Sequence, residues 1–515
     1  MIAPAIHMTR ERIAELFTRV GGDPLPPETQ TLVRFARRTL RQKYIDADIG
    51  ITGANIGIAS TGTLVIVTNE GNERLAATLP PVHIAVLGVE KIVPSHDEAN
   101  EILKVLARNA AGQKFSAYVS MITGPSRTGD IEMDLAIGVH GPIEVHIVLL
   151  DNGRWKTRED PDLRDALRCI RCGACANVCP PYAVVGGQAF GHIYTGPIGL
   201  VLTAMHHGLD AAGGPQSLCA SCNACESICP VGIPIPRQIL DVRQRYVAAH
   251  GLPLKKKAAT AALSNRALQT LGRVAQAPFS SEGRLRGAPL LGDQLSWRSL
   301  PALANPPLRK RRLLDGPVPQ LPGSAVAGQR VAYFPACLTD QMEPATGEAA
   351  VKVLRALGCE VSVPGGWTCC GLVAANAGDA AGAKPLLKQT IAALEADAAP
   401  VIVSTSTSCA LMLLEDGPHL LRDEPIWRRR AEAVAARVTD FTRFVDAALT
   451  GVPRSTFPVP RSGAARAEAD GQEDAAPAVT GKGLDGAPAR AVSSPITTPV
   501  SRATAWASGR KRDGY

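Results

Sequence analysis

The chain contains the stretch Cys169-Ile-Arg-Cys172-Gly-Ala-Cys175-Ala-Asn-Val-Cys179-Pro180, and the same spacing recurs in Cys219-Ala-Ser-Cys222-Asn-Ala-Cys225-Glu-Ser-Ile-Cys229-Pro230. Three thiolates spaced this closely wrap three corners of a [4Fe–4S] cube. The proline after the fourth cysteine stops the local helix, so that this thiolate turns away toward the other cube. The two runs therefore predict a domain built around two [4Fe–4S] clusters.

The crossed pattern predicts two sets of ligands, which are Cys169, Cys172, Cys175 and Cys229 for one cluster and Cys219, Cys222, Cys225 and Cys179 for the other. Two zinc ribbons or a disulfide framework are the alternatives. Zinc sites usually use two CxxC knuckles without a trailing Cys-Pro. Disulfides need an oxidising compartment, to which nothing in the sequence points. The spacing favours clusters of the kind found in two-cluster ferredoxins.

Length and composition indicate several domains. The chain has 515 residues, of which 45% are apolar, so about three cores are expected. No apolar run approaches the roughly 20 residues needed to cross a bilayer, and the first residues lack the pattern of a secretory signal. We therefore expect a cytoplasmic protein without a transmembrane segment, in a compartment where thiols stay reduced.

The charge balance argues against nucleic acid as a partner. A net charge of +8 is spread over the whole chain, and aromatic residues make up only 4% of it. Stacking on bases therefore has few side chains to use. The charge is compatible with a solvated surface and with peripheral contact with a membrane or an acidic partner.

Five segments follow from the pattern of apolar residues. Residues 1–155 alternate helical and strand-like runs, which predicts an α/β domain with a largely parallel sheet. Residues 156–250 form the cluster domain, mainly α-helical, and residues 251–328 read as a helix followed by a linker. Residues 329–449 form a second α/β domain. Residues 450–515 lack the apolar side chains for a core, so we expect a disordered tail.

A second group of cysteines lies in the third domain. Strands are predicted at 330–334, 360–363 and 401–404, followed by Cys337, by Cys369 and Cys370, and by Cys409. The helices between them are expected from Thr346, as N-cap, to Leu357 and over 384–397. Parallel strands end at one edge of a sheet, so the four thiols should gather there. A third iron–sulfur centre, a zinc site, a redox-active dithiol and ordinary buried cysteines are the possible readings. The remaining Cys359 is expected to be a buried thiol.

Loops of the first domain offer candidates for binding a carboxylate. Small hydroxyls, amides and cationic side chains are typical of such sites, and the candidates here are Thr61, Thr63, Asn69, Asn72, Arg74, His83 and Arg127. The alternative is that the Gly and Asn residues serve only tight turns. No residue is singled out as catalytic.

Several of these segments resemble lactate-utilisation iron–sulfur proteins of the LutB type, whose first part is a LUD domain. The matching segments are 52–63, 68–72, 79–83, 124–128, 138–142 and 194–199. Residues 329–449, with Tyr333-Phe-Pro-Ala-Cys337, Cys369-Cys-Gly371 and Ser408-Cys409, resemble a cysteine-rich CCG domain of the LutA type. The resemblance implies a Rossmann-like, NagB/CoA-transferase-like first domain that begins partway through, because the family has more than a hundred further residues before it.

The resemblance implies an iron–sulfur oxidoreductase component that passes electrons from the oxidation of L-lactate to pyruvate. Lactate or its oxidase and the other lactate-utilisation subunits are then the expected partners. The chain has no G-x-G-x-x-G after a strand, so a flavin or nicotinamide is expected elsewhere. One alternative is an electron-relay subunit for another 2-hydroxy-acid oxidase (glycolate or D-lactate) or for a heterodisulfide-reductase-like complex. The other is a structural iron–sulfur protein in assembly or regulation. This chain differs from the family pattern at position 406, which is Ser where a CxxC version of the CCG domain has a further thiol.

Overall fold

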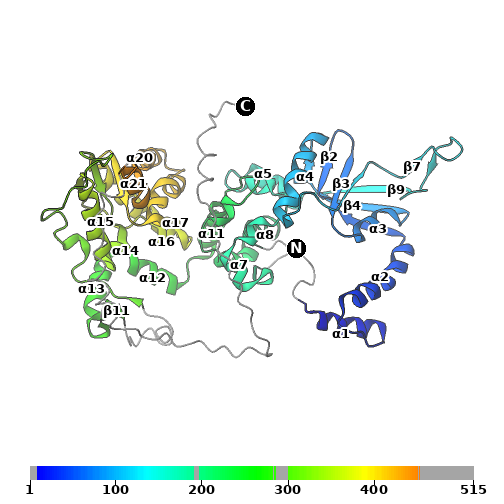
Figure 1. Cartoon of the computed structure of the whole chain (residues 1–515), viewed down its shortest axis with the longest axis horizontal. Helices are drawn as coiled ribbons and strands as arrows, with labels where there is room; N and C mark the ends of the chain where they lie inside the picture. Colours follow the sequence, from blue (N-terminus) through cyan, green and yellow to red (C-terminus); the bar gives the residue numbers. More distant parts are fainter. Residues whose placement is uncertain (1–7, 191–195, 282, 286–299, 451, 453–515) are drawn as a thin grey trace. The chain divides into compact units, whose positions relative to one another are not determined.

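The computed structural model describes residues 8–190, 196–281, 283–285, 300–450 and 452 (Figure 1). The expected disordered tail lies outside the described residues, apart from Thr450 and Val452. All contacts reported below lie within the unit Met1–Pro453. Among the described residues, no helix is both long and apolar enough to span a bilayer.

The N-terminal domain alternates helices and strands as expected. Its elements are α1 (Arg10–Gly21), α2 (Thr29–Ile45), β1 (Ile49–Gly53), β2 (Ile56–Ile58), β3 (Thr63–Thr68), α3 (Asn72–Thr78), β4 (Val82–Gly88), η1 (Val89–Lys91), β5 (Ile92–Val93), α4 (His96–Ala111), β6 (Tyr118–Ile122), β7 (Arg127–Thr128), β8 (Ala136–Ile137) and β9 (Glu144–Leu150).

Two main sheets form this domain, and only one is wholly parallel. The order β1-β4-β9 is parallel throughout. In the order β5-β2-β3-β6, however, β3 runs antiparallel to both β2 and β6. The expectation of a largely parallel sheet is therefore wrong for this half of the domain. A short turn that includes Gly62 (φ 65°) joins β2 to β3, and so short a connection can join only antiparallel neighbours.

Helix α4 covers one face of the mixed sheet (Figure 1). Its Ala99 and Leu103 pack against Ile56, Ile58 and Val65. On the other face, Leu64 of β3 packs against Ala85 and Leu87 of β4, which joins the two sheets. Helix α4, the mixed sheet and the parallel sheet are thus successive layers of the domain. The short helix η1 follows directly after β4 of the parallel sheet.

Helices joined by loops make up the cluster domain in its described residues, in agreement with the mainly α-helical prediction. They are α5 (Arg154–Glu159), η2 (Arg164–Arg168), α6 (Ala174–Asn177), α7 (Pro180–Val185), η3 (Gly187–Phe190), α8 (Pro197–His207), α9 (Leu209–Ala212), η4 (Pro215–Leu218), α10 (Ala224–Ser227) and α11 (Ile235–His250). Helices α8 and α11 supply much of the core, which includes Leu200, Leu202, Ile239 and Val242.

The connector contains more regular structure than one helix. It forms α12 (Leu254–Ser264), α13 (Arg266–Gln276), η5 (Ala277–Phe279), the strands β10 (Ser280–Ser281), β11 (Arg284–Leu285) and β12 (Leu300–Pro301), and η7 (Leu308–Lys310). The side chain of Asn265 accepts hydrogen bonds from Ala267 N and Leu268 N, so it caps α13 and separates it from α12.

The C-terminal domain has one parallel sheet of order β14-β13-β15-β16. Its elements are β13 (Arg330–Tyr333), α14 (Ala336–Gln341), α15 (Pro344–Ala356), β14 (Glu360–Ser362), α16 (Leu372–Asn376), α17 (Ala380–Glu395), β15 (Val401–Ser404), α18 (Thr407–Leu411), η8 (Met412–Asp416), α19 (Gly417–Leu420), α20 (Pro425–Ala435), β16 (Val438–Asp440) and α21 (Phe441–Ala448).

The predicted helix starts in this domain are displaced. Thr346 is not the N-cap of α15, because the helix already begins at Pro344, whose fixed φ suits the first helical position. Helix α17 begins at Ala380 rather than at residue 384, because the Asp379 side chain accepts from Gly382 N and caps it. Gly358 (φ 82°) follows α15 and lets the chain leave the helix.

Candidate metal centres

The two cysteine runs adopt the same backbone path. Arg171 and Ser221 occupy equivalent positions and both have positive φ, at 62° and 53°. The equivalent pair Gly173 and Asn223 also has positive φ, at 77° and 61°. Non-glycine residues seldom adopt this conformation. Its repetition curls each CxxCxxC loop in the same way, and each run then enters a short helix, α6 or α10.

The thiols of the two runs influence each other in the crossed pattern. Burial raises the pKa of Cys172, and the charges of Cys169 and Cys229 raise it further. Burial likewise raises the pKa of Cys179, to which Cys219 and Cys222 contribute. Cys229 therefore lies with the first run and Cys179 with the second.

These sites fit iron–sulfur cubes. Burial raises the pKa of Cys175 and of Cys225 to about 12, so in the absence of a cationic group these thiols hold their protons. Bound iron would stabilise the thiolates. Backbone N–H groups also point at sulfur, with Ser221 N 3.4 Å from Cys219 Sγ and Ile233 N 3.4 Å from Cys229 Sγ. Such bonds stabilise negative charge on a cluster.

The first run contacts the N-terminal domain through η1. The buried Glu90 carboxylate accepts hydrogen bonds from Arg154 and, at 3.3 Å, from Arg171 of the cysteine run. Its neighbour Lys91 is half-buried, and this loss of solvent is the main cause that lowers the pKa of Lys91 to about 8. Lys91 and Arg171 thus lie close to the first run, and their positive charge, partly offset by Glu90, would favour a more negative state of a cluster bound there.

The second run contacts the C-terminal domain through Arg243 of α11, which is 7% exposed. Its guanidinium donates to Gln216 Oε1 at 2.7 Å, to Gln216 O at 2.6 Å and to Cys219 O at 3.0 Å. Nη1 donates to Asn376 O at 2.6 Å. Asn376 ends α16, the helix that begins directly after Cys369, Cys370 and Gly371. One buried side chain therefore joins both cysteine sites.

Four of the five cysteines of the C-terminal domain lie together, as the strand pattern predicted. Cys370 Sγ is 3.2 Å from Cys409 Sγ. Hydrogen bonding with Cys369 and Cys409 raises the pKa of Cys337, whereas hydrogen bonding with Cys337 and Cys370 lowers the pKa of Cys369. Each thiol thus has two others as neighbours. We call Cys337, Cys369, Cys370 and Cys409 the thiol ring.

The thiol ring lies where the sheet order places ligand sites. Strand β13 has β14 on one side and β15 on the other. The chain therefore adds β14 on one side of β13 and then crosses to the other side for β15, although all four strands are parallel. Cys337 follows β13 and Cys409 follows β15, which is the crevice where open α/β sheets bind ligands. Ala336, directly before Cys337, has φ 59° and is fully buried. This strained conformation sets the direction in which the chain leaves β13 before Cys337. Such backbone strain is typical of functional sites.

Gly371 follows the tandem cysteines and precedes α16. Its φ is 87°, and a Cβ here would lie 2.8 Å from Ala383 O. Packing of α16 against α17 therefore requires glycine at this position.

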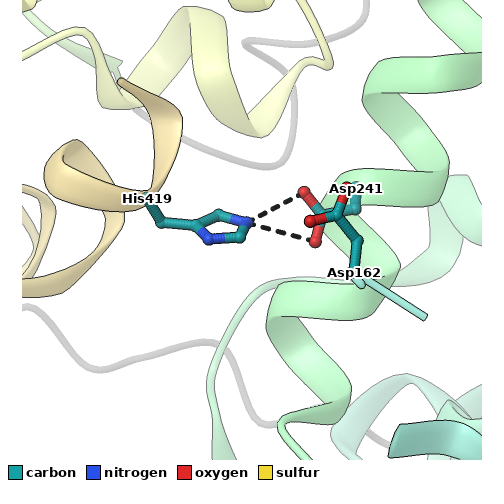
Figure 2. Close-up of side chains that lie close together, drawn as sticks. All are labelled: Asp162, Asp241 and His419. Atoms are coloured by element: carbon teal, nitrogen blue, oxygen red, sulfur yellow. Dashed lines mark hydrogen bonds and ion pairs between the residues drawn. The ribbon is translucent and has the colours of Figure 1, made fainter. Parts of the chain in front are cut away.

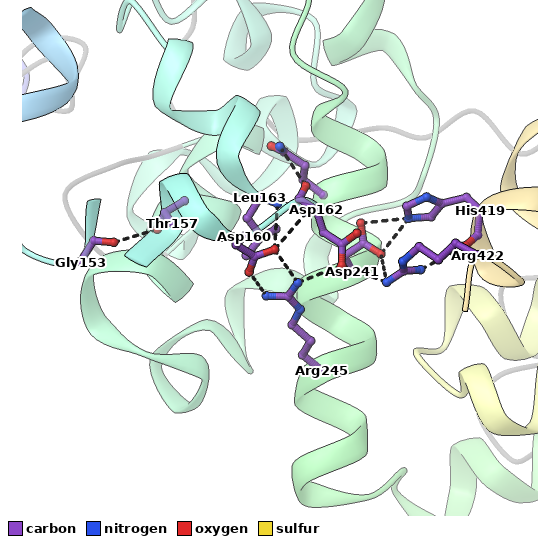
Figure 3. Close-up of polar contacts among 10 residues, drawn as sticks. Gly153, Thr157, Asp160, Asp162, Leu163, Asp241, Arg245, His419 and Arg422 are labelled. Atoms are coloured by element: carbon purple, nitrogen blue, oxygen red, sulfur yellow. Dashed lines mark hydrogen bonds and ion pairs between the residues drawn. The ribbon is translucent and has the colours of Figure 1, made fainter. Parts of the chain in front are cut away.

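A polar network joins the cluster domain to the C-terminal domain (Figures 2 and 3). Asp241 of α11 is 2% exposed and accepts from His419 Nε2 at 3.1 Å. Asp162 Oδ2 lies 2.9 Å from the guanidinium nitrogens of both Arg245 and Arg422. Asp162, Asp241 and His419 offer ligand atoms within 4.8 Å of one another. Because two guanidinium groups already occupy this site, the network is an ion-pair cluster rather than a cation site.

The candidate carboxylate-binding residues fall into separate groups. Thr63 Oγ1 lies 2.7 Å from Thr61 Oγ1 and 2.8 Å from Thr123 Oγ1. His83 is fully buried in β4, with Nε2 2.8 Å from Thr52 Oγ1. Arg127 lies on β7 and is exposed. Within the described residues, no hydrogen bond or ion pair joins these groups.

The remaining candidates contact neighbouring loops and side chains of the same domain. Asn69 accepts from Ala117 N and donates to Gln113 Oε1, both at 2.9 Å. Asn72 Oδ1 accepts from Glu73 N at 2.8 Å at the start of α3. The Arg74 guanidinium lies 5.0 Å from the centre of the Tyr118 ring. A role of these residues in substrate binding stays a prediction.

Comparison with known families assigns the three parts of the chain. A LUD domain matches residues 1–150, a 4Fe-4S dicluster domain matches residues 165–233, and a cysteine-rich domain, CCG, matches residues 331–414. The chain combines a LUD domain, a dicluster domain and a CCG domain. The resemblance seen in the sequence is thereby confirmed.

Known relatives agree with this assignment. Lactate utilization protein B of Bacillus licheniformis is 39% identical over 309 residues, which cover 58% of this chain and 62% of that protein. The Bacillus subtilis protein of the same name is 38% identical with the same coverage. An uncharacterized electron transport protein of Escherichia coli, YkgF, is 42% identical over 50% of this chain and 52% of its own length. The chain thus spans less than two thirds of the length of these relatives.

A solved structure also matches a small part of the chain. The crystal structure of a DUF162 family protein from Deinococcus radiodurans is 21% identical and covers 21% of this chain and 56% of its own. Its TM-score of 0.15 is too low to support a statement about the fold.

The sequence did not reveal the residues that connect the domains. Arg243, Asp241 and Arg245 lie on α11, whose pattern of polar residues resembles that of a solvated helix face. Asp241 and Arg243 are nevertheless buried, at 2% and 7% exposure. Their partners are Asn376, His419 and residues before the first cysteine run, which only the folded chain brings close.

Proposed function

We propose that the chain is an iron–sulfur electron-transfer component of L-lactate utilisation. In this proposal the eight cysteines of the dicluster domain hold two [4Fe–4S] clusters in the crossed arrangement, and the thiol ring holds a third centre. Oxidation of lactate to pyruvate releases two electrons and two protons, and each cluster accepts and passes on one electron at a time. The same proposal places the protein in the cytoplasm, with other lactate-utilisation subunits as partners.

One observation carries the proposal. Arg243 hydrogen-bonds Cys219 O of the second cysteine run and Asn376 O of the helix after the thiol ring. Arg171, inside the first run, pairs with Glu90 of the LUD domain. Contacts therefore run from the LUD domain through both cysteine runs to the CCG domain. This continuity supports electron transfer along the chain more than a purely structural role of the clusters.

The nature of the third centre is a separate part of the proposal. Four mutually adjacent thiols suit an iron–sulfur centre, and they also suit tetrahedral zinc or a dithiol. We favour the iron–sulfur centre because an electron path that reaches the ring needs a redox-active group at its end. Zinc has no redox chemistry and would end the path at the second cluster.

An anaerobic spectrum with and without L-lactate tests the function. Bleaching of the visible absorbance by L-lactate in the isolated protein would mean that this chain binds and oxidises the acid. Bleaching only after addition of a partner oxidase would identify a relay, a role that the electron transport relative also suggests. Absence of bleaching in both cases, with glycolate and D-lactate also inactive, contradicts the proposal. Iron and sulfide counts of about eight or about twelve would distinguish two clusters from three centres.

A further inference from the structure

A cavity of about 370 Å³ opens beside the thiol ring. The loops after β13 and β14 form one side of it, with Pro335 and Trp367 in its wall. Each of these residues lies two positions before a cysteine of the ring, Cys337 or Cys369. The connector forms the other side, from Leu308 to Asp315, together with Arg266 of α13. Its volume is within the range of sites for small molecules.

The cavity wall is strongly cationic. It includes Arg266, Arg309, Arg311 and Arg312, and a single acidic residue, Asp315. Three of the arginines have carboxylate partners, which are Asp340 for Arg309, Glu348 for Arg311 and Asp315 for Arg312. The first two pairs hold the connector against the CCG domain, whereas the Arg312–Asp315 pair lies within the connector. Among the four described arginines of this wall, only Arg266 is left without an ion pair.

Arg266 differs from the other three arginines. Among the described residues, its guanidinium donates no hydrogen bond and forms no ion pair, and the one acidic charge that acts on it, that of Asp340, is already paired with Arg309. It lies 5.5 Å from the centre of the Trp367 ring, and Arg309 lies 5.1 Å from the same centre. Burial, and next the nearby charge of Arg309, lowers the pKa of Arg266. An anion in the cavity would relieve this repulsion between the two guanidinium groups.

The loop after β14 adds backbone donors. In the described part of the chain, the N–H groups of Gly365 and Gly366 donate no hydrogen bond. Gly366 has φ 81°, and a Cβ at Gly365 would meet no atom within 4 Å. Successive free N–H groups beside a cationic side chain are typical of anion sites. The apolar side chains of Leu308 and Leu313 would contact a carbon skeleton.

We propose that this cavity binds a small organic anion that carries carboxylate or phosphate groups. Arg266 and the Gly365–Gly366 loop would bind the anionic group, a few residues from the thiol ring. Binding does not depend on electron transfer, so this proposal and the proposed function fail or succeed separately.

Anaerobic titration calorimetry of the metal-loaded full chain tests the site. The probes are L-lactate, pyruvate and citrate as carboxylates, and pyrophosphate and AMP as phosphates, each at constant ionic strength. Binding of at least one probe is expected, and the pattern across the two sets shows which anionic group the site prefers. If no probe binds, the proposal is overturned.

Two variants and their controls locate the binding. Arg266→Gln should weaken binding about tenfold or more, because a charge-assisted hydrogen bond is lost. Arg429→Gln, at an exposed arginine outside the cavity, should not weaken it. Gly365→Asp should abolish binding by repulsion, whereas Gly365→Ala fits the open space and should retain it. An unchanged visible spectrum and iron content would show that the metal centres are intact in all four variants. Equal affinity of Gly365→Asp and the unchanged protein would overturn the proposal.

Discussion

Arg243 Nη1 lies 2.6 Å from the backbone oxygen of Asn376, and the same guanidinium reaches the backbone oxygen of Cys219. The contact is closely packed, since a Cβ on Gly378 would lie 2.9 Å from Arg243 O. A cysteine run and the helix that follows the thiol ring are therefore held by one buried side chain. This bond fixes the spacing between two candidate redox sites.

Replacement of Arg243 by Gln should slow electron exchange between the dicluster domain and the thiol ring. It should also lower the free energy of unfolding by about 2–4 kcal/mol, because several hydrogen bonds from a buried charge are lost. Anaerobic denaturation measures the second effect, and rapid-mixing reduction followed at the absorbance of each centre measures the first. Arg237→Gln, on the same helix but with a 38% exposed side chain, is the control. Equal rates in the two variants would remove Arg243 from the path.

Cys370→Ala should remove the third centre and leave the two cubes intact. Cys370 is 2% exposed and contacts Cys409, so no water or other side chain can replace its sulfur. The iron or zinc content should fall by one centre, measured by metal analysis. Cys359→Ala is the matched control, because burial raises the pKa of Cys359 to about 11 and its sulfur lies near Val326 O instead. If both variants keep all their metal, the thiol ring is not a metal site.

His83 should make the LUD domain less stable as the solution becomes acidic. Burial lowers the pKa of His83 below its usual 6.5, and Nδ1 has no hydrogen-bond partner. The unfolded chain therefore binds a proton more readily than the folded one. Stability from this group is complete above pH 6.5 and is lost as the pH falls through that value toward the folded pKa.

A His83→Gln variant tests this pH dependence. The Gln side chain can still hydrogen-bond Thr52 but does not titrate. The unfolding free energy of the variant should therefore vary less between pH 5 and about 7 than that of the unchanged protein. The measurement is urea unfolding of the metal-loaded protein across that range. His146→Gln is the control, since His146 is half exposed on β9. Parallel pH curves for the His83 variant and the unchanged protein would contradict the assignment.

Divalent cations should not stabilise the network of Asp162, Asp241 and His419. Arg245 and Arg422 already bind the Asp162 carboxylate, so Mn²⁺ should leave the Tm unchanged. Asp241→Asn should lower stability by about 1–3 kcal/mol, because the Asp241 side chain is 2% exposed and the substitution weakens its bonds to His419 and Arg422. Thermal unfolding with and without Mn²⁺ tests both statements. A rise in Tm that Asp162→Asn abolishes would show that the cluster is a cation site after all.

Local patterns predicted much of this protein. The spacing from Cys169 to Cys179 and from Cys219 to Cys229 indicated a dicluster domain before any contact was known, and a dicluster domain matches this region. The positions of Cys337, Cys369 and Cys409 after successive strands predicted one shared site, which the parallel order of β13, β14 and β15 provides. These inferences succeeded because the spacing of metal ligands and the alternation of residues in a strand are both local patterns, which extend over only a few residues.

Sequence reasoning was weaker where one short turn or one side chain decides between alternative structures. It missed the antiparallel pairing of β3, the cap at Asp379 and the second connector helix, each of which depends on a short turn or a single side chain.

The sequence by itself determined which cysteines form groups and which kind of domain carries each group, because these depend on fixed spacing along the chain. Only the tertiary structure decided how the groups connect. Arg243 meets Asn376, and Arg171 meets Glu90, across long stretches of sequence. Such contacts arise from the burial of charged side chains between packed domains, where each charge needs a partner, and no local pattern encodes which partner that is.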